Sequence, residues 1–140
     1  MNDLSSSMPG NMWGSFMLNT PQVEAASRFL DVLAFRNQLI ASNMANIDTP
    51  GYRTLDINFS QELQRAHSED DAGGLSDASY SPVVRQVRGL MERPDGNNVS
   101  LERESLLLAD VQLRYNTAVQ LLRAEFHRIS SAIHEGSTSE

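Results

Sequence analysis

The sequence predicts a mainly α-helical protein, in which two long amphipathic helices near the chain ends form an antiparallel, coiled-coil-like pair. Three observations predict this fold class. Apolar residues concentrate in residues 23–59 and 99–133. Within both segments they recur at the alternating spacings of three and four that are typical of an amphipathic helix. The stretch between them is polar, and we expect a flexible middle segment with at most a short β ribbon.

The first helix is expected from about Pro21 to Asn46. Thr20 can cap it, Pro21 suits the first helical position, and Glu24 suits the positive end of the helix dipole. Its seam is apolar except at Asn37, which would fix the register of a paired helix. The seam comprises Val23, Ala26, Leu30, Leu33, Asn37, Ile40, Met44 and Ile47. A second apolar stripe beside it comprises Ala25, Phe29, Val32 and Leu39, so the apolar face is wider than one partner helix requires.

A polar segment follows, and we expect it to end the first helix in a tight turn. Pro50 disfavours helix at the preceding residue, and a Pro-Gly pair favours a type II turn because glycine accepts the positive φ that this turn needs. Asn43, Asn46 and Thr49 recur at every third position and can bond free carbonyls of the helix end. We therefore predict a hydrogen-bonded elbow that fixes the direction of the chain, formed by Asn43, Asn46, Thr49, Pro50, Gly51 and Tyr52.

The second helix is expected from about Leu101 to His134. Ser100 is a suitable N-cap, and Gly136 would close the helix. Its seam comprises Leu101, Leu108, Val111, Tyr115, Ala118, Leu122, Ile129 and Ala132. Glu104 and Glu125 interrupt this seam with charge, and four further apolar residues, Leu107, Leu121, Phe126 and Ile133, widen it.

The chain is expected to form a single domain over residues 1–140. We divide it into a flexible tail at 1–20, the N-terminal helix at 21–49, and a turn with a short extended or helical segment at 50–66. A linker with a weak strand at 67–98 and the C-terminal helix at 99–136 complete it. The tail carries Met8, Met12, Trp13, Phe16, Met17 and Leu18. These residues indicate either a disordered terminus or a segment that orders against a partner.

Composition argues against several classes of function. The net charge of -7 disfavours nucleic-acid binding, because phosphate neutralisation by basic residues supplies most of that affinity. The chain has no cysteine, no apolar run long enough to span a membrane, and an N-terminus unlike a cleavable secretory signal. His127 and His134 are seven residues apart, whereas a chelating pair on one helix would want a spacing of four. We expect no catalytic, cofactor or metal site, and we do not expect an enzyme.

The width of the two apolar faces predicts association with other chains, because two helices alone cannot cover both faces. We expect the assembly interface to include Leu30, Leu33, Ile40, Met44, Leu108, Val111, Tyr115, Leu122, Phe126 and Ile129. A soluble helical adaptor or export chaperone that holds a partner helix would explain the same seams. It would not explain the elbow.

The segment from Ala41 to Arg53, which reads ASNMANIDTPGYR, closely resembles the signature of flagellar rod and hook proteins. In that family an N-terminal helix ends in a Ser-Asn-x-Ala-Asn-x-x-Thr-Pro-Gly-Tyr turn. Further residues are similar to the short rod members of the family, namely Asp56, Phe59, the run from Asp95 to Glu102 with Glu104, and the pair Arg114-Tyr115. The chain departs from the usual pattern at Met44, Ile47 and Ser100.

The resemblance implies a structural component of the proximal rod in the bacterial flagellar basal body, two long helices packed into a tubular rod that spans the periplasm. It implies export through the flagellar type III apparatus without a cleavable signal peptide. The implied partners are copies of the chain itself, other rod proteins of the FlgC-like and FliE-like types, and the flagellar export gate. No cofactor is implied.

Overall fold

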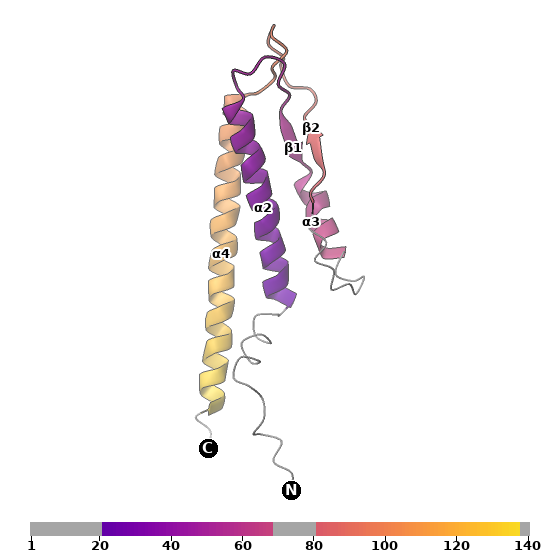
Figure 1. The fold of residues 1–140 in the computed structure, drawn as a ribbon. Coiled ribbons are helices and arrows are strands. Elements are labelled where there is room, and N and C mark those ends of the chain that lie inside the picture. The colour runs from indigo at the N-terminus through magenta and orange to yellow at the C-terminus, as the bar shows by residue number, and fades with distance from the viewer. Residues whose placement is uncertain (1–20, 69–80, 138–140) are drawn as a thin grey trace.

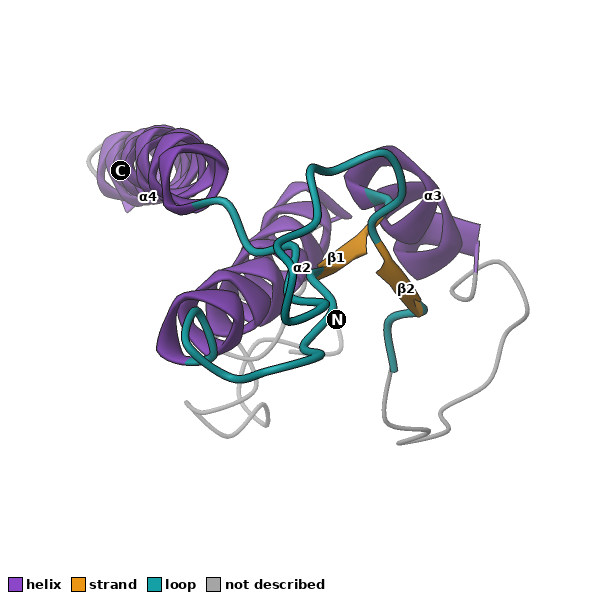
Figure 2. Ribbon diagram, turned by 90° about the horizontal axis from the view of Figure 1, so that it is seen from above, coloured by secondary structure: helices purple, strands orange, loops and turns teal. Residues whose placement is uncertain are grey.

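The computed structural model describes residues 21–68 and 81–137. Its elements follow in the order α2 (Pro21–Ala45), β1 (Leu55–Ile57), α3 (Phe59–Ser68), β2 (Val84–Gln86) and α4 (Leu101–Ser137). Figure 1 shows α2 and α4 side by side, with β1, α3 and β2 forming an arm next to them. Seen from above in Figure 2, α2 lies between α4 and this arm. The predicted fold class, mainly α-helical with two long helices and a small β ribbon, is confirmed.

Three contacts along the pair place α2 and α4 antiparallel (Figure 1). Near one end, the Asn43 side chain of α2 donates a hydrogen bond to Glu104 of α4. Further along, Leu33 and Val111 share one buried cluster. Further still, Ala26 and Ala118 line the same groove. Residue numbers fall along α2 as they rise along α4, so the two helices run in opposite directions.

The core is a narrow strip between α2 and α4. Leu33, Ile40 and Val111 are buried at its centre, where periodicity had placed three seam positions. Phe29, Met44, Phe59, Leu107 and Leu108 pack around them and stay partly exposed. Val32, on the second apolar stripe of α2, is fully buried as well. On α4 several large apolar side chains lie outside the enclosed stripe and face solvent.

The arm is fastened to both helices. Its strands pair antiparallel with Asp56 opposite Arg85. Phe59, the first residue of α3, meets the Phe29 ring of α2 edge-on with the ring centroids 5.5 Å apart. The Arg114 guanidinium of α4 lies 5.5 Å from the centroid of the same Phe59 ring. Contacts with the Phe29 ring and with the Arg114 guanidinium hold the Phe59 side chain at a defined position against both helices.

Several boundaries differ from those expected. The first helix ends at Ala45, because the Asn46 amide is shared between the carbonyls three and four residues back and the Ile47 amide bonds only three residues back, in a tight turn. The third helix continues to Ser68, into the segment expected to be linker. The last helix continues to Ser137, one residue past the Gly136 at which it was expected to close. The cap Thr20, the tail at 1–20 and the rest of the linker, 69–80, lie outside the described residues.

Candidate functional site: a polar junction and the exposed apolar surface of the helix pair

The elbow meets the loop that precedes α4 at one end of the helix pair (Figure 1). The Gly51 amide donates to the Asp95 carbonyl over 2.8 Å, and the Asn98 amide donates to the Tyr52 carbonyl over 3.3 Å. Gly51 and Gly96 have φ of 73° and 83°. A Cβ on Gly96 would lie only 3.4 Å from the Gly51 Cα. The two loops therefore approach each other backbone to backbone, which only glycines permit at these φ values.

The Pro50-Gly51 turn has the features of a type II turn. The Tyr52 amide donates to the Thr49 carbonyl over 3.2 Å, and the third turn position, Gly51, has the positive φ that this type requires. The Thr49 hydroxyl donates to the Asn46 side chain, and the Asn46 side-chain amide donates to the Ser42 carbonyl. The elbow thus supplies part of its own hydrogen bonding.

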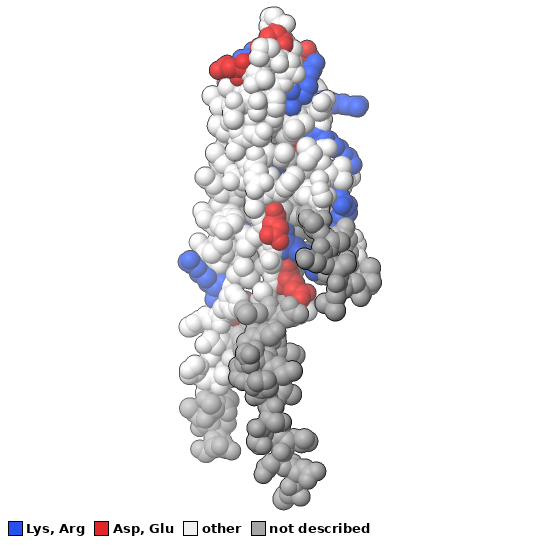
Figure 3. Space-filling view, in the orientation of Figure 1, with Lys and Arg blue, Asp and Glu red and all other residues white. Residues whose placement is uncertain are grey.

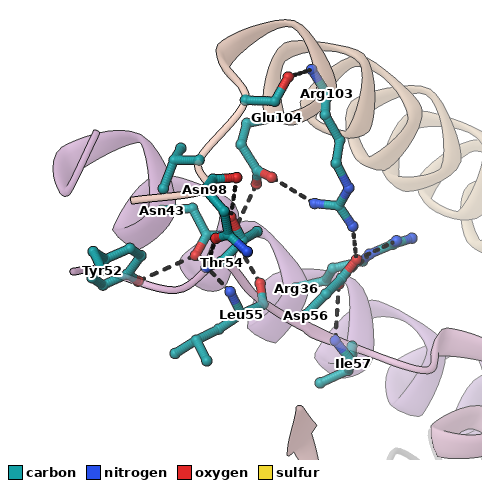
Figure 4. A network of polar contacts seen from close by, with 12 residues as sticks. Arg36, Asn43, Tyr52, Thr54, Leu55, Asp56, Ile57, Asn98, Arg103 and Glu104 are labelled. Atoms are coloured by element: carbon teal, nitrogen blue, oxygen red, sulfur yellow. Dashed lines mark hydrogen bonds and ion pairs between the residues drawn. The ribbon is translucent and has the colours of Figure 1, made fainter. Parts of the chain in front are cut away.

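Asn43 is the centre of the elbow (Figure 4). Its side chain is 1 % exposed and makes four hydrogen bonds. Nδ2 donates to the Leu55 carbonyl over 2.8 Å and to Glu104 Oε2 over 3.0 Å. Oδ1 accepts from the Leu55 amide over 3.0 Å and from the Tyr52 hydroxyl over 3.2 Å. One amide therefore joins the end of α2, the start of β1 and the first turn of α4.

Asn97 closes the same end from the other loop. Its Nδ2 lies 2.9, 3.1 and 2.8 Å from the carbonyl oxygens of Asn46, Ile47 and Thr49. These carbonyls follow the last turn of α2, where helical partners run out, so Asn97 acts as a cap supplied from a distant part of the chain. The neighbouring Asn98 accepts the Thr54 amide on its side chain over 2.7 Å. The sequence analysis included both asparagines only in the run from Asp95 to Glu102 that resembles the family, and it assigned neither of them a structural role.

A charged cluster extends the junction toward the arm (Figure 4). Arg36 of α2 forms a bidentate pair with Asp56 of β1, with both N···O distances 3.0 Å. Arg103 of α4 donates to Asp56 over 2.8 Å and to Glu104 over 2.5 Å. We call the cluster and the bonded side chains around it the polar junction. It comprises Arg36, Asn43, Thr54, Asp56, Asn97, Asn98, Arg103 and Glu104.

The charge state of Asp56 follows from these contacts. Burial by itself would raise the pKa of Asp56. The hydrogen bond from Arg36, the Ile57 amide, the Arg36 charge and the hydrogen bond from Arg103 together outweigh that effect and hold the pKa below its ordinary value. Asp56 is therefore an anion at neutral pH, held between two cations.

The polar junction is internally satisfied. Among the described residues, no buried side-chain nitrogen or oxygen lacks a hydrogen-bond partner. The same residues contain no cluster of His, Asp and Glu arranged to hold a metal ion. They also contain no helix long and apolar enough to cross a membrane. A network in which each buried polar group is paired rigidifies a fold, so the junction is best understood as a structural lock.

The residues predicted for the assembly interface fall into three groups. Leu33, Ile40 and Val111 are buried inside the chain and build the core. Five others are half-buried, namely Leu30, Met44, Leu108, Leu122 and Ile129. Tyr115 and Phe126 are 46 % and 40 % exposed. The interface role of the set stays a prediction, but the three core residues already have partners within the chain.

The most exposed apolar side chains of α4 lie elsewhere. Leu106, Leu113 and Leu121 are 73 %, 67 % and 67 % exposed. Leu113 and Leu121 border a groove of about 540 Å³ between the helices, with Ala25 and Phe29 of α2 on its other side. Sequence reasoning included Leu121 only as a widening of the seam and missed the other two leucines. Their spacing of seven residues was the available signal.

Charge is unevenly distributed over the surface. On the face shown in Figure 3, the upper part of the helix pair is largely uncharged, whereas charged side chains gather at the loop end and along the edge of the arm and also occur lower on the helices. Uncharged helical surface beside the polar junction is suited to lateral packing against other elongated chains.

Comparison with known proteins agrees with this description. No family model matches the chain. It is 30 % identical over 135 residues to the flagellar basal body rod protein FlgB of Salmonella typhimurium, a match that covers 83 % of this chain and 98 % of that protein. The FlgB of Escherichia coli is 29 % identical over 135 residues, with the same coverage. That of Borrelia hermsii is 30 % identical over 129 residues, covering 79 % of this chain and 94 % of the relative.

Two long helices locked at a Pro-Gly elbow, with apolar surface left along their length, define a structural helical protein of the flagellar rod type. The particular family follows from the relatives. The chain belongs to the FlgB family and is a structural component of the flagellar basal-body rod. This membership favours the rod subunit over the adaptor or chaperone alternative, which the seams alone left open.

Proposed function

We propose that the chain is a non-catalytic subunit of the proximal rod, which crosses the periplasm, and that α2 and α4 pack lengthwise against neighbouring subunits. The observation that carries this proposal is the exposure of Leu106, Leu113 and Leu121, each two thirds exposed or more. Contiguous exposed apolar surface usually marks a contact with another macromolecule.

The geometry of these leucines specifies the kind of contact. Leu106 and Leu113 are seven residues apart, so they lie on one face of α4, about 150° around the helix from the buried Val111. Leu113 also borders the groove between the helices, together with Leu121, so the outer face and the groove adjoin. One neighbour can therefore pack on the outer face of α4 while another fits a helix into the groove. A subunit with two such surfaces can be surrounded by others, as a tubular assembly requires.

The proposed partners are copies of the chain itself, rod proteins of the FlgC-like and FliE-like types, and the export gate of the flagellar type III apparatus. The proposal rests on the family to which the chain belongs and on the exposed leucines of α4. Related chains with the same helix pair would present complementary apolar faces, so that one mode of packing could serve several rod proteins.

A motility assay tests the proposal in a strain that lacks its own copy of this protein. Leu113→Asp places a charge where the outer face of α4 meets the groove, at a side chain outside the core. We therefore expect soluble, normally folded protein and loss of swimming. Gln64→Asp is the matched control, because it adds the same charge at an exposed polar position of α3, away from both proposed surfaces, and should leave swimming intact. Normal swimming with Leu113→Asp would overturn the proposed interface.

A further inference from the structure

The loop that precedes α4 carries the only Asp-Gly pair of the chain, Asp95-Gly96, and the chain has no Asn-Gly pair. An aspartate followed by glycine is open to attack by the next main-chain nitrogen on its side-chain carboxyl group, because glycine has no Cβ to hinder the approach. The Asp95 side chain is 39 % exposed, so water reaches it. The sequence alone therefore marks Asp95 as reactive, and the structure shows what restrains it.

The reaction of such a pair needs no reagent besides water. The Gly96 nitrogen loses its proton and bonds to Asp95 Cγ, while one carboxyl oxygen leaves as water, so that a cyclic succinimide forms. Water then adds to a ring carbonyl and the C–N bond at that carbon breaks. Opening at Cγ restores aspartate, whereas opening at the main-chain carbonyl carbon gives isoaspartate. In isoaspartate the main chain runs through Cβ and Cγ and is longer by one carbon atom.

The fold engages each group that takes part in this reaction. The Gly96 amide donates to the Arg93 carbonyl over 2.9 Å, a bond that the succinimide cannot make because its nitrogen carries no hydrogen. Asp95 Oδ1 accepts the Asn97 amide over 3.0 Å, and Arg93 Nη2 lies 3.6 Å from Oδ2. The Asp95 carbonyl accepts the Gly51 amide of the elbow over 2.8 Å. Ring closure must therefore break contacts on both sides of the reacting bond.

We propose that Asp95 is a site of spontaneous isoaspartate formation, that the closed contact between the two loops suppresses the reaction, and that the modified chain cannot close this contact. The extra main-chain carbon displaces the carbonyl that Gly51 bonds, and a Cβ on Gly96 would already lie 3.4 Å from the Gly51 Cα, which leaves no room for a shifted loop. Asn97, which caps the end of α2, follows the modified bond directly and loses its position as well.

The modification would act as a one-way exit from assembly. Local opening of the loops exposes Asp95 to the reaction, and closure protects it, so isoaspartate accumulates in chains that remain open. A chain modified in that state can no longer lock the helix end, so it does not enter the basal-body rod. This inference concerns the covalent chemistry of one loop, and it does not depend on which surfaces of α4 meet neighbouring subunits.

The first test compares the chain in isolated basal bodies with the purified chain in denaturant, incubated at the same pH and temperature. Peptide mass spectrometry with electron-transfer fragmentation distinguishes isoaspartate from aspartate at position 95. We expect isoaspartate to accumulate steadily in denaturant and severalfold more slowly in basal bodies. Asp95→Glu in denaturant is the control, because its longer side chain would have to close a larger and less readily formed ring, so no isomer should appear at this position.

The second test asks whether modified chains are excluded from assembly. In a strain that lacks the cell's isoaspartate-repair methyltransferase, the pool of unassembled chain should contain both isomers, whereas freshly isolated basal bodies should contain aspartate alone. Three results would overturn the inference. They are a denatured chain that forms no isoaspartate at position 95, equal rates in denaturant and in basal bodies, and equal isoaspartate fractions in the pool and in fresh basal bodies.

Discussion

Removing the Asn43 side chain tests the polar junction most directly. In Asn43→Ala, the Leu55 amide and carbonyl each lose a partner, and the buried carboxylate of Glu104 loses one of its two donors. The position is 1 % exposed, so water cannot replace these bonds without a structural change. Asn43→Ala therefore removes hydrogen bonds from buried polar groups, one of which is charged, and this lowers the stability of the fold.

The magnitude follows from the lost bonds. A neutral hydrogen bond contributes about 1 kcal/mol and one to a charged group about 1.5–3 kcal/mol, which together give a loss of about 3–5 kcal/mol. Domains of this kind are stable by only about 5–15 kcal/mol, so the variant would lose a large fraction of its stability. For a chain of this length the expected fall in Tm is about 10–20 °C.

Thermal unfolding followed by far-ultraviolet circular dichroism measures this fall. Asn37→Ala is the matched control, since Asn37 lies on the same helix and is exposed, and its Tm should change little. Equal Tm values for the two variants would refute the reasoning, because the buried network would then contribute no more than a surface asparagine.

Two further predictions concern the charged cluster and the loop contact. Because the fold holds the pKa of Asp56 below its ordinary value of 3.8, the ionised group stabilises the chain above that value, and the contribution is lost as the pH falls toward the lowered pKa. Asp56→Asn should lower stability at neutral pH by about 3–5 kcal/mol and make the acid decline of Tm shallower; an equally steep decline would contradict this. Gly96→Ala should cost about 1–2 kcal/mol for its positive φ, plus the crowding against Gly51. Gly89 also has a positive φ but has open space around it, so Gly89→Ala is the control. If Gly96→Ala lowers Tm no more than Gly89→Ala does, the close approach of Gly96 to Gly51 is contradicted.

The features that could be predicted from the sequence are local ones. Helical periodicity located α2 and α4 because each turn repeats the same environment. The Pro50-Gly51 pair predicted its turn because proline fixes its own φ and glycine accepts the positive φ that the turn requires. Periodicity also indicated that Leu33 and Val111 are buried. It could not tell burial within the chain from burial against another chain, since both leave the same pattern.

The features that could not be predicted depend on residues far apart in the sequence. Glu104 was interpreted as a charged interruption of the seam, but it is 0 % exposed and bonded by Asn43 and Arg103. Nothing in the local sequence of Asn97 indicates that it will cap a helix that ended some fifty residues earlier. Such pairings are visible only once the two loops have been brought together.

That separation has a consequence for the order in which the molecule can form. The bonds that lock the helix end join positions 44 to 61 residues apart, such as Thr54 with Asn98 and Asn43 with Glu104. A chain fed through a narrow passage from either end must therefore deliver about 70 % of its length or more before the Asn43–Glu104 bond can form. Bringing the loops together also carries an entropic cost that local helix contacts do not, which slows this step relative to helix formation. A chain that is only half delivered therefore cannot form these bonds, and the helix end is locked only after part of the remaining half has followed.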